Sequence, residues 1–405
     1  MSIAIISKRE TNPQPHHGLR PQTSAQPATL SPQGRKTRDV RLDFFRGISL
    51  FVIFVSHVPY NPWAEFIPAR FGFSDATEVF VFCSGLASAF AFARVFDSHG
   101  FGIGAARIAQ RCWQIYWAHI GSFMVIVAAM IGADYLFGTG DLFLRQVGVQ
   151  SFLEAQGGAR FLGLMTLSYV PPYFDILPMY FVILALIPLM MALSRVHTAL
   201  PMATSAVLWG IAGAHWLELP RDPLIPGEAW FFNPFAWQLV FFTGFALKRG
   251  WLPTPPADRR LIALALAYVL ICLPLSWAPA LDWSPWLQDQ RNALAAMIDK
   301  THVGPFRYLH FLSLAYLAMI AAGPGGSNLR GEAARVCATV GGQSLACFMA
   351  GLGLSFLASV PLTLLAPATA LDVAVVNLVG IGLIILTALA VTWFKSSPWQ
   401  RPIHI

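Results

Sequence analysis

Long apolar runs separated by short polar links fill most of the chain between residues 41 and 394. Each run is about as long as the roughly 20 residues that an α-helix needs to cross the ~30 Å hydrocarbon core of a membrane. The runs lie at residues 41–60, 74–96, 112–137, 173–194, 200–217, 230–248, 260–279, 306–322, 336–359 and 370–394. The pattern predicts an all-α fold, a polytopic transmembrane helical bundle of about ten spans.

Composition and charge agree with a membrane protein. Of the 405 residues 56% are hydrophobic and only 12% are charged, with a mean hydropathy of +0.58. Soluble domains carry about 25% charged residues. The net charge of +7 could suggest nucleic acid, but the basic residues are scattered at the ends of apolar runs, so we expect a lipid bilayer and no nucleic acid as partner. Their distribution places the N- and C-termini in the cytoplasm, which an even number of spans also requires.

The remaining segments predict a simple domain organisation. Residues 1–38 are rich in Pro, Gln, Ser and Thr, which predicts a disordered cytoplasmic tail. A transmembrane domain would occupy residues 39–395, and residues 396–405 would form a second cytoplasmic tail. The five cysteines show no metal-binding spacing, so we interpret them as small core residues and expect no metal site.

The first run, RLDFFRGISLFVIFVSHVPY, carries three groups that hydrocarbon disfavours: Asp43, Arg46 and His57. At ~100° and ~1.5 Å per residue, Arg46 and His57 differ by only ~20° around the helix and lie ~16 Å apart along it. A guanidinium near one membrane surface and a titratable imidazole deeper in suggest a functional site. Alternatively, Arg46 extends to the cytoplasmic interface and pairs with Asp43, and His57 packs as a neutral side chain.

Two pairs of charged residues flank the next two runs. Asp75 and Glu78 share one helical face at the outward start of the second run, where one carboxylate could orient or charge His57. Alternatively, Ser74 caps this helix and the acids complement its positive end. Arg107 and Arg111 share a face at the cytoplasmic start of the third run. They could dock a phosphorylated donor or simply anchor the helix.

Further polar residues lie in or at the ends of the predicted spans, most of them near the outward half. Individually each is typical of a helix cap or an interhelical hydrogen bond, but together they suggest a polar cavity open to the outside that contains His57. They include Asp175, Asn233, Arg307 and His310, with Gln343 in the ninth run. The outward loops are rich in Trp, Tyr and Pro, which suits either headgroup anchors or platforms for sugar rings.

Several motifs together resemble a known family. The pair Arg46 and His57, with ten residues between them, is similar to the membrane-bound acyltransferase 3 superfamily. The resemblance sharpens to the OpgC family through FGFSDATEVFVFCSG, YVPPYFDILPMY, WFFNPFAWQ, GPFRYLHFLSLAY and GGQSL. Members of that family attach succinyl groups to osmoregulated periplasmic glucans. The resemblance implies a multi-pass enzyme of the bacterial inner membrane, with residues 39–395 as its acyltransferase domain.

The resemblance and the residue pattern together assign roles. Succinyl-CoA would be the acyl donor, without any permanently bound cofactor, and the acceptor would be a hydroxyl of periplasmic glucan. We expect His57 to be the general base, with Asp75 or Glu78 tuning it. The expected donor-binding residues are Arg46, Arg107 and Arg111. Arg307 or Lys300 would recognise the succinyl carboxylate or acidic groups of the glucan, and the expected substrate-binding residues are Asp43, Asp175, Asn233, Arg307, His310 and Gln343.

Two other classes of protein fit parts of the pattern. A membrane transporter or flippase for a sugar or acyl carrier would show repeated halves with matching broken helices, and the sequence shows no such repeat. A haem-binding membrane cytochrome would need two histidines at one depth on facing spans, for which His57 and His310 are the available pair. The oligomeric state has no signature in the sequence.

Overall fold

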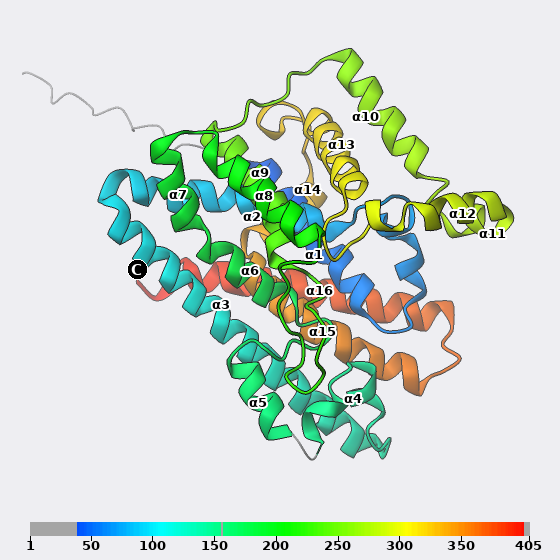
Figure 1. The fold of residues 1–405 in the computed structure, drawn as a ribbon. Coiled ribbons are helices and arrows are strands. Elements are labelled where there is room, and N and C mark those ends of the chain that lie inside the picture. The colour runs from blue at the N-terminus through cyan, green and yellow to red at the C-terminus, as the bar shows by residue number, and fades with distance from the viewer. Residues whose placement is uncertain (1–38, 155–156, 401–405) are drawn as a thin grey trace, which may run out of the picture. The chain divides into compact units, whose positions relative to one another are not determined.

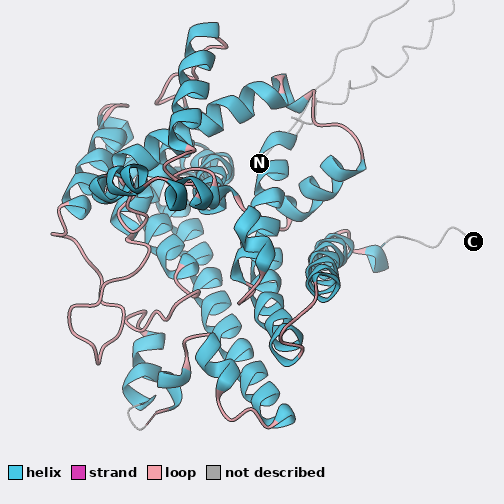
Figure 2. Ribbon diagram, turned by 90° about the vertical axis from the view of Figure 1, so that its right-hand side faces the viewer, coloured by secondary structure: helices cyan, strands magenta, loops and turns pink. Residues whose placement is uncertain are grey.

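The computed structural model describes residues 39–154 and 157–400. Within these residues every regular element is helical, apart from one isolated bridge between Pro220 and Ala229 (Figure 2). The all-α prediction is therefore confirmed for the described residues. The predicted N-terminal tail, and residues 401–405 of the predicted C-terminal tail, lie outside them.

The α-helices follow one another along the described chain as labelled in Figure 1. They are α1 (Val40–His57), α2 (Ala76–Ser88), α3 (Arg94–Phe137), α4 (Leu142–Gln146), α5 (Gly157–Met165), α6 (Ile176–Ala185), α7 (Ile187–Val196), α8 (Leu200–Gly213), α9 (Pro234–Arg249), α10 (Arg259–Cys272), α11 (Ala278–Trp283), α12 (Pro285–Ala293), α13 (Pro305–Ala322), α14 (Glu332–Gly342), α15 (Ser344–Leu364) and α16 (Ala370–Lys395). Shorter 3₁₀ or π turns lie between them: η1 (Pro62–Phe66), η2 (Pro68–Arg70), η3 (Ala89–Ala93), η4 (Gln150–Leu153), η5 (Ala295–Met297), η6 (Pro324–Gly326) and η7 (Pro398–Gln400).

Each of the ten apolar runs coincides with a helix or a pair of helices. Five helical stretches in the described residues are long and apolar enough to cross a membrane: Ala76–Phe137, Ile176–Val196, Pro305–Ala322, Ser344–Leu364 and Ala370–Lys395. Helix α1 carries three charged residues, and α9 and α10 have only 16 and 14 residues. The number of ten spans therefore stays a prediction.

Two predicted boundaries differ from the structure. Residues 97–111, expected to link two spans, are helical, and α2, η3 and α3 form one helical stretch. Gly100 bends it, because its φ of 85° lies in the left-handed region that glycine adopts without strain. The ninth run is divided at Gln343, whose ψ of 33° separates α14 from α15.

Local sequence explains where the principal helices begin. Asp39, Asn233 and Thr369 have extended backbones, and their side chains accept hydrogen bonds from the first free N–H groups of α1, α9 and α16. Asp372 completes a capping box with Thr369 at the start of α16. Hydrogen bonds and the charge of Arg41 also hold the pKa of the Asp39 carboxyl below its usual range.

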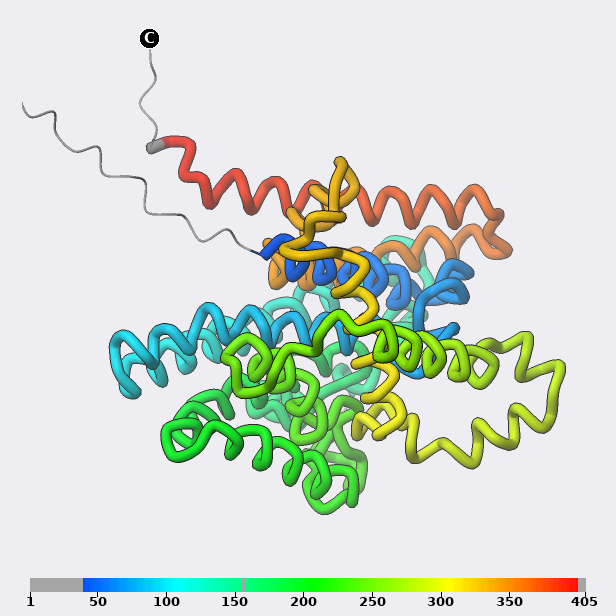
Figure 3. The backbone as a smooth tube through the Cα atoms, turned by 90° about the horizontal axis from the view of Figure 1, so that it is seen from above, coloured from blue at the N-terminus to red at the C-terminus, as the bar shows by residue number. Residues whose placement is uncertain are grey.

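Glycines allow the central helices to approach closely. A Cβ on Gly47 of α1 would lie 1.9 Å from the carbonyl oxygen of Cys337 in α14, and one on Gly341 would lie 1.8 Å from that of Asp43. Small residues let membrane helices approach in this way. In Figure 3, α1 (blue) runs beside the antiparallel pair α15 and α16 (orange and red), which it also contacts. The charged helix α1 is thus enclosed by other helices.

Contacts between helix ends sort those ends into two sets. Arg249 pairs with Asp97 at 2.6 Å, which joins two helix ends predicted to be cytoplasmic, and Lys395 at another such end donates to Gln343 at 2.6 Å. At the opposite ends, Lys300 pairs with Asp75 at 2.6 Å. The number of spans and the orientation of the termini stay predictions.

Candidate active site

His57 is the last residue of α1, and its imidazole is oriented by the preceding turn of the helix. Its Nδ1 lies 2.7 Å from the carbonyl oxygen of Ile53 and 3.1 Å from the hydroxyl of Ser56. A carbonyl oxygen can only accept, so Nδ1 carries the proton in this geometry. The basic lone pair is then on Nε2. The side chain is half-buried, and a basic Nε2 is what the predicted general base requires.

An aromatic residue packs against this imidazole. The ring of Tyr173 lies edge-on to His57 with 5.5 Å between centroids, and its backbone has a φ of 70°. This conformation is uncommon for a bulky residue and is found where the surrounding structure holds it. Phe356 of α15 packs edge-on against the same tyrosine at 5.4 Å. The neighbourhood of His57 is therefore built by α1, α15 and the segment before α6.

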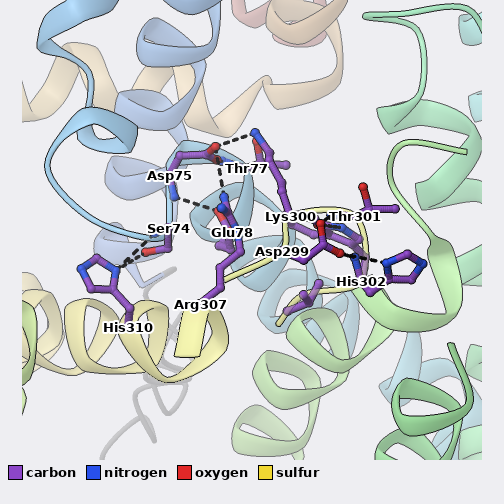
Figure 4. A network of polar contacts seen from close by, with 12 residues as sticks. Ser74, Asp75, Thr77, Glu78, Asp299, Lys300, Thr301, His302, Arg307 and His310 are labelled. Carbon is purple, nitrogen blue, oxygen red and sulfur yellow. Dashed lines mark hydrogen bonds and ion pairs between the residues drawn. The ribbon is translucent and has the colours of Figure 1, made fainter. Parts of the chain in front are cut away.

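A compact ionic cluster lies at the N-terminal ends of α2 and α13 (Figure 4). The Asp75 Oδ2 atom accepts from Lys300 Nζ at 2.6 Å and from Arg307 Nη2 at 3.3 Å. Arg307 Nε donates to Glu78, whose side chain is completely buried. Two cations thus balance two carboxylates, which lowers the cost of burying them.

The carboxylates of the ionic cluster also begin α2. Asp75 Oδ1 accepts from the N–H of Thr77 at 2.7 Å, and Glu78 Oε2 accepts from the N–H of Asp75 at 2.9 Å. The N-cap is therefore Asp75, and the alternative that Ser74 caps the helix is wrong. All four carboxylate oxygens have a donor, whereas the orienting partner of His57 is the Ile53 carbonyl. A role for Asp75 or Glu78 in tuning His57 stays a prediction, and any such influence would act through their charge.

Ser74 and His310 are joined beside the ionic cluster. The N–H of Ser74 donates to His310 Nδ1 at 3.3 Å, and its hydroxyl lies 2.8 Å from the same atom. A Cβ on Gly72 would lie 2.5 Å from His310 Nε2, which is buried without a hydrogen-bond partner among the described residues. This packing leaves no room for a porphyrin at His310, which argues against the cytochrome alternative.

Arg46 lies at the break between α14 and α15. Its Nη2 donates to the hydroxyl of Ser344, the first residue of α15. The neighbouring Gln343 donates to Thr392 at 3.1 Å and accepts from Lys395. Helices α1, α15 and α16 thus meet at this point through polar groups, ~16 Å along α1 from His57 at ~1.5 Å per residue.

Arg107 and Arg111 lie on α3 beyond Gly100. Arg107 is exposed and donates to Gln110, and Arg111 donates to Gln114 at 3.1 Å. These bonds stay within one helix face, and Arg111 is only partly exposed. Their assignment to the donor stays a prediction.

The other predicted substrate-binding residues serve structural contacts. Asp43 is buried where α1 crosses α14, and Asp175 is buried at the start of α6 without a side-chain capping bond. Asn233 caps α9 and donates to Glu218 Oε2 at 3.1 Å. These positions within the protein do not test whether Asp43, Asp175 and Asn233 bind substrate.

An apolar recess of about 400 Å³ opens beside α1, lined by Phe51, Val52, Val55, Trp63, Phe66, Ile67 and Pro68. At ~100° per residue, its α1 residues lie ~120–160° around the helix from His57. The recess therefore belongs to another face of α1 and is separate from the candidate site.

Sequence reasoning found His57 and the charged residues but missed Tyr173. A tyrosine in an aromatic and proline-rich stretch has no polarity or spacing that distinguishes it. Its positive φ is the feature that marks it, and only the folded backbone reveals that angle.

Comparison with protein families decides the classification. A family model described as OpgC protein matches residues 38–396. The chain belongs to the OpgC family. Membership indicates a role in glucan modification, and the matched region contains all the candidate residues discussed above. Comparison with curated proteins and with solved structures finds no match.

Membership in the OpgC family agrees with the physical features of the described residues. OpgC proteins are membrane-associated, and five helical stretches here are apolar and long enough to span a bilayer. The half-buried imidazole of His57 lies on the charged helix α1 within the matched region, and its role in acid–base chemistry stays a prediction.

Proposed function

We propose that this chain is an O-acyltransferase of the bacterial inner membrane that moves a succinyl group from cytoplasmic succinyl-CoA to hydroxyls of periplasmic glucan. Family membership supports the glucan and the succinyl group. The observation that carries the mechanism is the hydrogen bond from His57 Nδ1 to the Ile53 carbonyl, because it leaves Nε2 as the base.

The reaction balances around one proton. His57 Nε2 takes the proton of a sugar hydroxyl as its oxygen attacks the thioester carbonyl, which forms a C–O bond and a tetrahedral oxyanion. The oxyanion collapses, the C–S bond breaks, and the protonated imidazole returns the proton to the coenzyme A thiolate. A positioned base of this kind contributes about 10²–10⁴ in rate.

The donor would approach from the Arg46 end of α1. Guanidinium groups suit phosphate, and Arg107 and Arg111 are available at the predicted cytoplasmic surface. The ~16 Å between Arg46 and His57 is comparable to the reach of the pantetheine arm, so the thioester can extend along α1 towards His57.

Lys300 is the better candidate for the free succinyl carboxylate. Its side chain is 30% exposed, whereas Arg307 is 9% exposed and bonds to both carboxylates of the ionic cluster. The Lys300 ammonium also lies 5.4 Å from the ring centroid of Phe232, which helps to hold it in place. A bound carboxylate would share this ammonium with Asp75.

The proposal is tested by measuring how fast the purified protein transfers a labelled succinyl group from succinyl-CoA to glucan. We expect His57→Ala and His57→Asn to lower the initial rate by about 10²-fold or more, because both lack the basic Nε2. The Asn variant retains a donor near the Ile53 carbonyl, so it separates loss of the base from loss of the helix contact.

His197→Ala is the matched control, because His197 is exposed after α7 and distant in sequence from the site. Elution volume and melting temperature establish that each variant is folded. Normal transfer by both His57 variants would refute the assignment. Vesicle uptake of glucan without label transfer would instead support a transporter.

A further inference from the structure

Two histidines and a glutamate that have no part in the proposed acyl transfer converge in the described chain. The potential ligand atoms of His215, Glu218 and His302 all lie within 4.8 Å of one another. Glu218 Oε1 is 2.8 Å from His302 Nε2 and 3.2 Å from His215 Nδ1. The link after α8 thus meets the segment before α13 through three groups that can all bind a metal ion.

The hydrogen-bond partners of His302 determine which of its ring nitrogens faces Glu218. Its Nδ1 lies 2.8 Å from Asp299 Oδ2, which as a carboxylate oxygen accepts the Nδ1 proton (Figure 4). In a neutral imidazole Nε2 then presents a lone pair towards Glu218. A lone pair and a carboxylate oxygen repel each other at 2.8 Å unless a cation lies between them. That cation is either a proton held between the two groups or a metal ion.

The surroundings of the three groups favour a metal ion. A carboxylate that accepts the distal N–H of a histidine is the usual outer partner of a metal-binding imidazole. Asp299 has this position and is itself fixed by the N–H groups of Thr301 and His302. Asn233 Nδ2 holds the other oxygen of Glu218 at 3.1 Å. Glu218 and His302, the two partly buried potential ligands, are therefore each oriented by a second side chain.

We propose that His215, Glu218 and His302 bind one Zn²⁺ ion or a similar divalent transition metal. Two imidazoles and one carboxylate form a known zinc ligand set that leaves a fourth position for water. His215 is exposed, so that position opens to solvent.

The ion would connect the loop before α9 to residues 299–304. The backbone of this segment is already held by Trp209 Nε1, which donates to Val303 O at 3.0 Å, and by Trp237 Nε1, which donates to Lys300 O at 3.0 Å. Lys300 is two residues from His302 and pairs with Asp75. Metal binding therefore immobilises the segment that carries Lys300, whether or not the proposed acyl transfer is correct.

The site is tested by measuring the metal content and the Zn²⁺ affinity of the tag-free, full-length protein in detergent. We expect one Zn²⁺ per chain after loading and dialysis, and Co²⁺ substitution should give the visible absorption of a four-coordinate site. His215→Ala and Glu218→Gln should abolish stoichiometric retention. Asp299→Asn should weaken affinity by about 10–100-fold, as expected for loss of an outer partner.

His197→Ala controls for histidines elsewhere on the surface and should retain the ion. His215 is exposed, so its replacement should leave the fold intact, and elution volume checks this. Equal Zn²⁺ binding by wild type, His215→Ala and Glu218→Gln would overturn the proposal. So would absence of stoichiometric Zn²⁺ in the wild type, since a proton held between His302 and Glu218 would then explain the contacts.

Discussion

Glu78 illustrates how a single residue can have both a structural and an electrostatic function. It is completely buried, accepts from Arg307 through one oxygen and completes the capping box of α2 through the other. Removing its charge leaves the guanidinium of Arg307 buried with only part of its compensation. Breaking a buried ion pair in this way lowers the free energy of unfolding far more than breaking an exposed one.

We expect Glu78→Gln to destabilise the protein by about 3–5 kcal/mol, seen as a lower melting temperature in detergent. Glu65→Gln is the matched control, because the Glu65–Arg70 pair is exposed and should contribute about 0–1 kcal/mol. Adding Arg307→Gln to Glu78→Gln should restore part of the loss, since no unpaired charge remains buried. Equal melting temperatures for the two single variants would show that the ionic cluster is not a stability determinant.

At this scale the sequence predicts which residues are chemically important but not their partners. Asp75 and Glu78 are recognisable because they are three residues apart at the start of an apolar run. Their cations come from residues 300 and 307, more than 220 positions away. Likewise Glu218 and His302 are 84 residues apart, so no local spacing indicates a metal site. Long-range pairing of this kind depends on tertiary structure.

Helix α1 depends on glycine at its crossing with α14. A methyl group on Gly47 would overlap the backbone oxygen of Cys337, and a backbone atom cannot turn aside as a side chain can. One helix would have to move, which would also displace Arg46 from Ser344. The close crossing therefore couples the packing of α1 to the position of its charged residue.

Gly47→Ala should destabilise the protein by about 1–3 kcal/mol or more through overpacking, with a lower melting temperature and reduced acyl transfer. Gly382→Ala on α16 is the control, because no atom lies within 4 Å of its added Cβ. Alanine there should be neutral or stabilising by up to about 1 kcal/mol. A melting temperature for Gly47→Ala as high as that of Gly382→Ala would contradict the close crossing.

Helix positions were more predictable than helix boundaries. Each of the ten apolar runs contains a helix or a pair of helices, because burial and lipid exposure both demand apolar residues, whereas α4, α5 and α12 lie outside these runs. Hydrophobicity did not reveal the break at Gln343, since the residues on both sides are apolar and small. It also predicted a link between two spans after residue 96, and there two helices meet at a kink at Gly100. Such breaks depend on backbone geometry and on contacts such as the one between Arg46 and Ser344.

At the scale of the whole molecule, the two sets of helix ends determine which reactions are possible. His57, the ionic cluster and the proposed metal site belong to one set, and Arg46 belongs to the other. Acyl transfer across the membrane requires the first set to face the periplasm and the second to face the cytoplasm. The reverse orientation would present His57 to the compartment that lacks the glucan.

Cysteine labelling in spheroplasts measures this orientation directly. Asp289 on α12 and Ser327 after η6 are exposed and belong to opposite sets of ends. Four of the native cysteines are buried, so replacing the partly exposed Cys337 leaves little background. We expect a membrane-impermeant maleimide to label Asp289→Cys in intact spheroplasts and Ser327→Cys only after permeabilisation. Labelling in the opposite order would place His57 in the cytoplasm and exclude acylation of periplasmic glucan by the route from Arg46 to His57.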